Sequence, residues 1–273
     1  MKSIFSNRFL LLTAVCLAVL FGSARASEDP ALTREQMEEF LSHAEVIRSK
    51  RVGEGITNPY RLTLNDGSLT HDGAFQPVDE RKNFKRFDNG TTEMNFVDSY
   101  RYNIAAYRIA GLLGLQDMMP VTVERKWKGM TGSLSWWLTT QMDEGERYEK
   151  NIRPPDVRAF NRQMHKIRVF RELVYDSDLN ARNVLIGEDW ELYMIDFSRA
   201  FRLYHDLRNA KNLEMCSREL MEKLQQLDRD TLTEATKDLL SGTEVDGVMA
   251  RRDLIVEHFK KLIEEKGEPA VLY

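Results

Sequence analysis

VFRELVYDSDLNARNVLIGEDWELYMIDFSRAF, residues 169–201, is the stretch that decides the fold. It contains two short apolar runs, residues 184–186 and 192–195, which are separated by Gly187 and acidic residues. Short apolar runs bounded by turn residues predict the two strands of a hairpin. The second run ends directly in Asp196, and a polar loop that follows an expected helix precedes the first run. The predicted order is helix, acidic loop, strand, turn, strand and acid.

Three polar side chains stand at the ends of these expected elements, namely Asp178, Asn183 and Asp196. Two carboxylates roughly 4 Å apart repel each other by about 1 to 4 kcal/mol, depending on local screening. Such a cluster favours a bound cation, and carboxylate and amide oxygens suit a hard one such as Mg²⁺ or Mn²⁺. The alternative is that the acids of this loop only form a turn, because Asp and Asn bond readily to their own backbone.

The pattern resembles the catalytic loop and metal-binding segment of protein-kinase-like enzymes. The kinase template reads D-x-x-x-x-N, and Asp178 to Asn183 has that spacing. The pattern DxDxNxxN…IDFxxAF resembles the atypical kinases: the HipA toxin kinases, the phosphoinositide kinases, the secretory-pathway kinases and, more closely, a secreted bacterial kinase-like group. Two positions depart from the template. Residues 175–177, Tyr-Asp-Ser, replace the His-Arg before the Asp, and Ser198 replaces the Gly after Asp196-Phe.

This resemblance implies an α+β, two-lobed protein-kinase-like fold, with a small β-rich N-lobe at residues 59–150 and a mostly helical C-lobe at residues 151–273. It also implies transfer of the γ-phosphate of ATP to a hydroxyl of a protein or small molecule, with Mg²⁺ or Mn²⁺. Asp178 would accept the proton of that hydroxyl, and Asn183 and Asp196 would hold the metal ion.

Two further departures fall in the expected N-lobe. Gln76, expected to face the nucleotide, stands where the kinase strand carries a Lys, and Asn103 stands where the Glu partner of that Lys is expected, in a helix predicted over residues 99–114. Losing both partners together leaves no orphan charge, and the two amides could instead share a hydrogen bond worth about 1 kcal/mol. The swap leaves two alternatives open. One is a catalytically inactive kinase-like (pseudokinase) binding or scaffold module, and the other is an AMPylating relative that transfers the nucleotide.

Residues 120–146 predict two strands and then the hinge between the lobes. Under the resemblance, backbone amides near Leu138 to Met142 would hold adenine, so both residues are expected at the cofactor. Trp136 and Trp137 are expected on opposite faces because strand side chains alternate, with one in the core and the other lining the cleft.

The other elements follow from local patterns. Asp66-Gly67 predicts a hairpin within residues 59–79, and the polar segment 80–98 predicts an exposed loop or hairpin. Helices are expected over residues 34–48, over 156–174 and from Phe201 to the end of the chain. Four single residues also carry expectations: His165 and Arg168 exposed, Arg199 paired with Asp176 in preference to phosphate, and Cys216 buried.

Residues 1–26 predict a signal peptide. Lys2 and Arg8 form a positive start, an apolar core follows, and residues 24–26 form an A-x-A cleavage site. The core is shorter than the roughly 20 residues of a membrane span, and an uncleaved anchor is the alternative. Residues 27–58 would then form a helical N-terminal extension.

The mature chain is expected to be exported to the periplasm or secreted, and not bound to the membrane after cleavage. Removal of the leader would move the formal net charge from −4 to −7, because the leader carries Lys2, Arg8, Arg25 and no acid. A net negative charge argues against nucleic acid as the main partner. Cys216 would be the sole remaining cysteine, which excludes an internal disulfide. The expected partners are therefore a nucleotide and a hydroxyl-bearing substrate.

Overall fold

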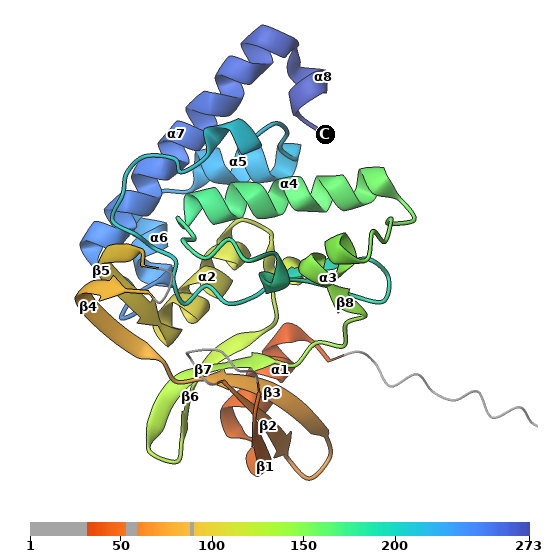
Figure 1. Ribbon diagram of the computed structural model, residues 1–273, viewed down its shortest axis with the longest axis vertical. Helices are drawn as coiled ribbons and strands as arrows, with labels where there is room; N and C mark the ends of the chain where they lie inside the picture. Colours follow the sequence, from red (N-terminus) through yellow and green to blue (C-terminus); the bar gives the residue numbers. More distant parts are fainter. Residues whose placement is uncertain (1–31, 53–58, 88–89) are drawn as a thin grey trace, which may run out of the picture. The chain divides into compact units, whose positions relative to one another are not determined.

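The computed structural model describes residues 32–52, 59–87 and 90–273, so the expected signal peptide lies outside the described residues. The N-lobe is built on one antiparallel sheet of five strands in the order β1-β2-β3-β7-β6 (Figure 1). The bounds of these strands are β1 Glu45–Arg51, β2 Tyr60–Asn65, β3 Thr70–Gln76, β6 Thr122–Trp127 and β7 Met130–Trp136. The hairpin predicted around Asp66-Gly67 is confirmed as β2 and β3, and the two strands predicted after residue 120 are confirmed as β6 and β7.

Helix α1 (Arg34–His43) packs on this sheet and α2 (Tyr100–Leu112) packs on β6 and β7. α1 begins with a capping box between Thr33 and Gln36. Its buried face shares a cluster with Leu62, Phe75 and Leu134 of the sheet, among others. The helix predicted over residues 34–48 is wrong beyond His43. Residues 45–51 instead form β1, because they pair with β2, a tertiary contact that local periodicity does not encode.

A separate two-stranded hairpin, β4 (Asp79–Arg86) and β5 (Thr92–Ser99), lies between β3 and α2 along the chain. It accounts for the polar segment 80–98, which the sequence predicts as an exposed loop or hairpin. Phe84 and Met94 face each other across the strands and are both exposed, while Phe96 is buried. The part of the hairpin that carries Phe84 and Met94 is therefore exposed, whereas the end of β5 next to α2 is buried.

The C-lobe is mostly helical and surrounds a small sheet in the order β10-β9-β8. Its elements are β8 Met142–Asp143, α3 Glu144–Glu149, α4 Val157–Leu173, β9 Val184–Ile186, β10 Leu192–Met194, α5 Arg218–Gln226, α6 Arg229–Ala235, α7 Gly242–Lys266 and α8 Glu268–Val271. The predicted helix over 156–174 and the predicted hairpin within residues 184–195 are confirmed. The prediction of helix directly after Phe201 is wrong as far as Ser217. Residues 202–217 contain a short 3₁₀ turn, Ala210–Asn212, and no α-helix.

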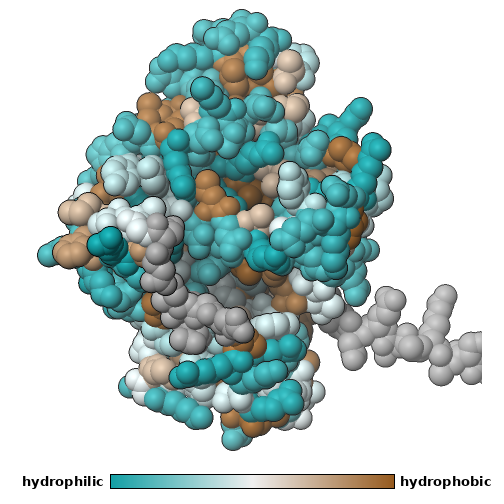
Figure 2. Space-filling model, in the orientation of Figure 1, coloured by the Kyte–Doolittle hydropathy of each residue, from teal (hydrophilic) through white to brown (hydrophobic). Residues whose placement is uncertain are grey.

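The C-lobe core includes Phe170 and Phe197, which pack edge to face, together with Cys216, which is buried as expected. His165 was expected at the surface, but it is only 8% exposed, so that expectation is wrong. Figure 2 shows a mostly hydrophilic face with small, separate hydrophobic patches, as expected for a chain that buries most of its apolar side chains. No helix among residues 32–52, 59–87 and 90–273 is long and apolar enough to span a membrane.

Gly132 provides a test of how tightly β7 approaches β3. A Cβ at this position would lie 2.6 Å from the carbonyl oxygen of Gln76 and 2.8 Å from Cα of Pro77, both backbone atoms. We expect Gly132→Ala to lower the free energy of unfolding by about 1–3 kcal/mol, because the strands must separate. Gly111→Ala is the matched control, since its Cβ meets nothing within 4 Å and Ala is the better helix former. Urea unfolding of both variants distinguishes them, and equal effects would contradict the close approach.

Candidate active site

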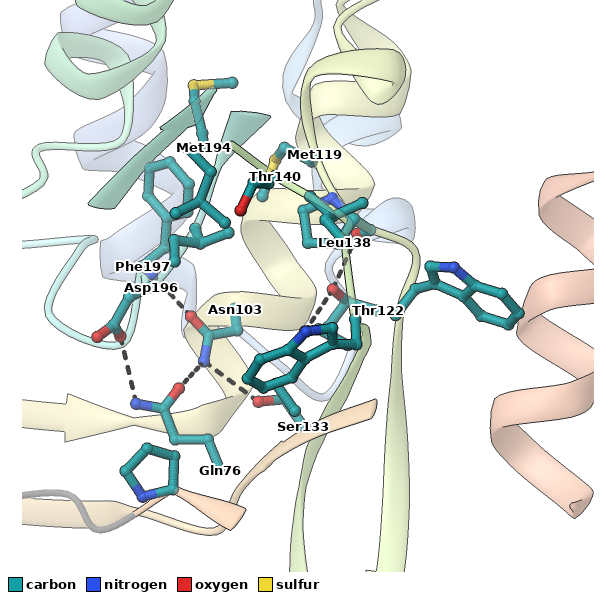
Figure 3. A pocket seen from close by; sticks show the side chains of 18 residues that line it. Gln76, Asn103, Met119, Thr122, Ser133, Leu138, Thr140, Met194, Asp196 and Phe197 are labelled. Atoms are coloured by element: carbon teal, nitrogen blue, oxygen red, sulfur yellow. Dashed lines mark hydrogen bonds between the residues drawn. The ribbon is translucent and has the colours of Figure 1, made fainter. Parts of the chain in front are cut away.

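A cavity of about 340 Å³ lies where β3, β7, the hinge and β10 meet (Figure 3). Its wall combines apolar side chains with a few polar ones, as is typical of a small-molecule site. The residues that line it are Pro59, Ala74, Gln76, Asn103, Met119, Pro120, Thr122, Ser133, Ser135, Trp136, Trp137, Leu138, Thr140, Leu185, Met194, Ile195, Asp196 and Phe197. The sequence analysis singled out several of these, but it missed Met119, Met194 and the hydroxyls of Thr122, Ser133 and Ser135. Alternation along β6 and β7 was the signal that could have indicated the hydroxyls.

Gln76 and Asn103 meet in this cavity, and their predicted amide–amide hydrogen bond is confirmed. Nδ2 of Asn103 donates to Oε1 of Gln76 at 2.6 Å and also to Oγ of Ser133 at 3.2 Å. Nε2 of Gln76 in turn donates to Oδ1 of Asp196 at 3.3 Å. Hydrogen bonds between uncharged amide side chains therefore connect Asn103 of α2, through Gln76 of β3, to the carboxylate of Asp196 (Figure 3).

Asp196 directly follows β10 in a left-handed backbone conformation, with φ at 58°. Asp tolerates this region better than most residues because its short side chain bonds locally. The hydroxyl of Ser198 donates to Asp196 Oδ1 at 3.0 Å, and the backbone N–H of Phe197 donates to Oδ1 of Asn103 at 2.7 Å. These two bonds fix the turn that directs the Asp196 carboxylate into the cavity.

The catalytic-loop candidates lie beside this strand. The N–H of Ile195 donates to the carbonyl of Asn183 at 3.1 Å, so Asn183 is one residue from Asp196 across the hairpin. Burial raises the pKa of Asp176, and the charges of Asp178 and Asp196 both raise it further. Asp196 lines the cavity, whereas Asp178 and Asn183 are not among the described residues that line it. A single site formed by Asp178, Asn183 and Asp196 therefore stays a prediction.

Asp176 and Asp178 have different surroundings. Asp176 is 1% exposed, its Oδ1 accepts the N–H of Asp178 at 3.0 Å, and its Oδ2 lies 3.4 Å from Nε of Arg171. Burial raises the pKa of Asp176 to about 7, against the opposing attraction of Arg171. Asp178 is partly exposed. Asp176 is therefore enclosed within the loop, whereas Asp178 is partly open to solvent.

A further acid, Asp98 at the end of β5, lies close enough to Asp196 to feel its charge, and the sequence analysis missed it. It is 4% exposed, and its pKa is raised by burial and further by the charge of Asp196. Its neighbour Ser99 donates its N–H to the carbonyl of Ser198 at 2.8 Å. No sequence spacing places β5 beside residue 198, because the contact spans about a hundred residues.

The hinge leaves backbone groups available to a base. The N–H of Trp137 bonds to Asp72 and the N–H of Gln141 bonds to Ile186. Between them, the N–H groups of Leu138, Thr139 and Thr140 form no backbone hydrogen bond within the described chain. Leu138 and Thr140 line the cavity.

Met142 was expected at the cofactor, and the structure corrects this. It begins β8, pairs with Ile186, packs against the C-lobe core and is not among the described residues that line the cavity. Trp136 and Trp137 both line the cavity, and Trp136 also packs against the buried cluster of the N-lobe, edge to face with Phe40, so the expectation that one of them contacts the core is confirmed. Trp136 stacks on His71, and Trp137 lies under the guanidinium of Arg61.

Asn183 and Asp196 fit a hard divalent cation by donor type, one amide and one carboxylate oxygen. The Asn183 side chain is buried, and its Nδ2 has no hydrogen-bond partner among the described residues, so no protein group fixes its amide. In the described part of the chain no three His, Cys, Asp or Glu residues gather as metal ligands. A cation at this site would therefore complete its shell with phosphate and water oxygens.

Arg199 does not pair with Asp176, which corrects the sequence expectation. It forms an ion pair with Glu93 of β5, as Arg202 does, and Arg171 of α4 takes the place beside Asp176. Arg168 is partly buried and not exposed as expected. The sequence could not rank these arginines because their partners lie in distant segments.

No family model and no curated protein matches the chain. Solved structures match it in fold. The structure of hydra Fam20 with sugar has a TM-score of 0.64 at 14% identity, covering 90% of this chain and 93% of that chain. The Golgi casein kinase, also solved with Mn and ADP bound, has a TM-score of 0.61 at 12% identity, covering 88% and 78%.

The Helicobacter pylori proinflammatory kinase CtkA has a TM-score of 0.53 at 11% identity, covering 83% of this chain and 98% of that chain. Identities this low show the fold alone. The structural matches confirm the fold that residues 169–201 predict: this chain has the two-lobed architecture of the atypical protein-kinase-like proteins.

Proposed function

We propose that this chain is an exported phosphotransferase that moves the γ-phosphate of ATP to a hydroxyl of a protein or small molecule. The observation that supports this is the position of Asp196, which lines one cavity with Leu138 and Thr140 of the hinge, whose N–H groups form no backbone hydrogen bond with the described residues. A base bound at the hinge would direct its phosphates toward Asp196. The kinase-like fold of the chain supports this orientation of the nucleotide.

The chain's own residues would then divide the work. Asp178, partly exposed, would accept the proton of the acceptor hydroxyl within hydrogen-bond reach. Asn183 and Asp196 would hold Mg²⁺ or Mn²⁺, which neutralises charge on the phosphate oxygens. Gln76 would orient Asp196 through its amide N–H. Phosphoryl transfer requires mainly positioning and electrostatic stabilisation, which these groups can supply.

Two alternatives follow from the same site. The neutral Gln76–Asn103 pair, together with the scarcity of ATP outside the cytoplasm, favours a pseudokinase that binds but does not transfer. Transfer of AMP instead of phosphate is the other alternative, and differently labelled ATP distinguishes the two.

Labelled ATP tests the proposal. We expect purified protein with Mg²⁺ or Mn²⁺ to transfer label from γ-labelled but not α-labelled ATP. Asp196→Asn should lower the rate about 100-fold or more and remove the metal-dependent melting shift with ATP, because it deletes the metal-binding charge. Asp189→Asn is the control, since it makes the same change on the exposed turn of the same hairpin. Transfer of α-label indicates the AMPylating alternative, and a melting shift without label transfer indicates the pseudokinase.

Asn103→Asp tests the amide chain. The new carboxylate keeps the acceptor for the Phe197 N–H but faces the Gln76 carbonyl and the Ser133 hydroxyl without donors. We expect the free energy of unfolding to fall by about 1–3 kcal/mol and ATP affinity to fall with it, because a buried group is left unsatisfied. Calorimetric titration and urea unfolding measure both. Asn161→Asp, which adds the same charge to the exposed face of α4, should change neither.

A further inference from the structure

Ser177, the residue before Asp178, joins two segments of the candidate active site. Its hydroxyl donates to the carbonyl of Arg199 at 2.7 Å and accepts from Nε and Nη2 of Arg202 at 3.4 and 3.3 Å. Its backbone N–H also donates to the Arg199 carbonyl at 3.3 Å. The kinase template has an Arg at this position, next to the catalytic Asp. Here the guanidinium comes from the segment that follows Asp196.

Arg202 is held at the centre of three segments. It is 6% exposed, and it donates to the carbonyl of Asn95 at 3.3 Å while forming an ion pair with Glu93, both in β5. Burial lowers the pKa of Arg202, and Glu93 opposes that shift. A buried guanidinium is costly unless it is paired and hydrogen-bonded, so these partners fix its position. Through Ser177 that position is transmitted to the catalytic loop.

A second buried arginine fixes the backbone of the first. Arg251 of α7 is fully buried and donates to the carbonyls of Leu173, Arg202 and Tyr204. Leu173 ends α4, the helix that leads into the catalytic loop. One side chain therefore ties the start of that loop to the segment that carries Arg202.

The start of the loop before Asp178 and the segment that carries Arg202 lie side by side, and each contains a residue with a strained backbone conformation. Tyr175 and Phe201 have positive φ angles of 47° and 57°, and the N–H of Phe201 donates to the carbonyl of Val174 at 2.6 Å. Left-handed conformations of bulky residues cost on the order of 1–3 kcal/mol each and persist only when their surroundings enforce them. The contacts of Arg202 and Arg251 supply that enforcement.

We propose that Arg202 is a positioning residue that sets Asp178 relative to Asp196 by holding the Ser177 hydroxyl. The catalytic consequence of this inference rests on the proposed function, whereas its effect on the loop does not. Arg199 offers a matched comparison. It also pairs with Glu93 and also lies over the ring of Phe96, but among the described residues its side chain forms no hydrogen bond with Ser177.

The test compares Arg202→Met and Ser177→Ala with Arg199→Met. Hydrogen exchange of the peptide spanning residues 174–184 should become about tenfold faster in Arg202→Met and in Ser177→Ala, the change expected when a hydrogen bond to a charged group is lost. Exchange should be unchanged in Arg199→Met. Ser177→Thr keeps the hydroxyl and should restore slow exchange. In the label-transfer assay, Arg202→Met should lower kcat about 10- to 100-fold with little change in the KM for ATP.

The double variant Arg202→Met with Ser177→Ala should accelerate exchange by less than the two single effects combined, because both changes remove the same bond between Arg202 and Ser177. The inference is overturned if exchange in this peptide is unchanged in Arg202→Met, if Arg199→Met accelerates it equally, or if the two changes add. Absence of label transfer by the unaltered protein would refute the proposed function alone, since the exchange measurement still decides the role of Arg202.

Discussion

The side chain of Asn103 is the junction on which the candidate active site depends. Its amide contacts three segments that are far apart in sequence: Gln76 of β3, Ser133 of β7 and the backbone of Phe197 after β10. The planar amide has N–H donors and an oxygen acceptor, so it can form hydrogen bonds to a residue of each of two strands and to the turn after β10 at the same time. Gln76 in turn donates a hydrogen bond to Asp196, so a residue of the N-lobe helps to orient the carboxylate that is the metal-binding candidate.

This junction carries no formal charge, unlike the Lys–Glu pair of the kinase template. Two amides avoid the desolvation cost of a buried ion pair, and their hydrogen bond is not screened by salt. Neither amide titrates, so the contact does not depend on pH. The charged groups of the region lie instead around Glu93, where Arg199 and Arg202 converge. The amide that contacts Asp196 is therefore separate from the charged groups that contact the loop before Asp178.

Local patterns in the sequence were sufficient for most of the fold. The hairpin before Asp196, the helices α2 and α4 and the bond between Gln76 and Asn103 all follow from periodicity, turn residues or paired departures from one template. Such signals lie within a few residues of one another or occupy positions that a known fold places in contact.

What the sequence could not supply are partners chosen by tertiary packing. Arg199 had a nearby acid in Asp176, yet it pairs with Glu93, 106 residues away. Residues 45–51 form β1 because they pair with β2. Met142 belongs to β8 because it pairs with Ile186 of β9. In each case a distant segment outweighs the local pattern.

The walls of the cavity also contain a natural optical probe. Trp136 stacks on His71 with ring centroids 3.7 Å apart and an interplanar angle of 18°, and burial lowers the pKa of that imidazole. Indole emission depends on the polarity and charge around the ring, and a protonated imidazole quenches it more strongly than a neutral one. The intrinsic fluorescence of the unlabelled chain should therefore respond to whatever enters the cavity.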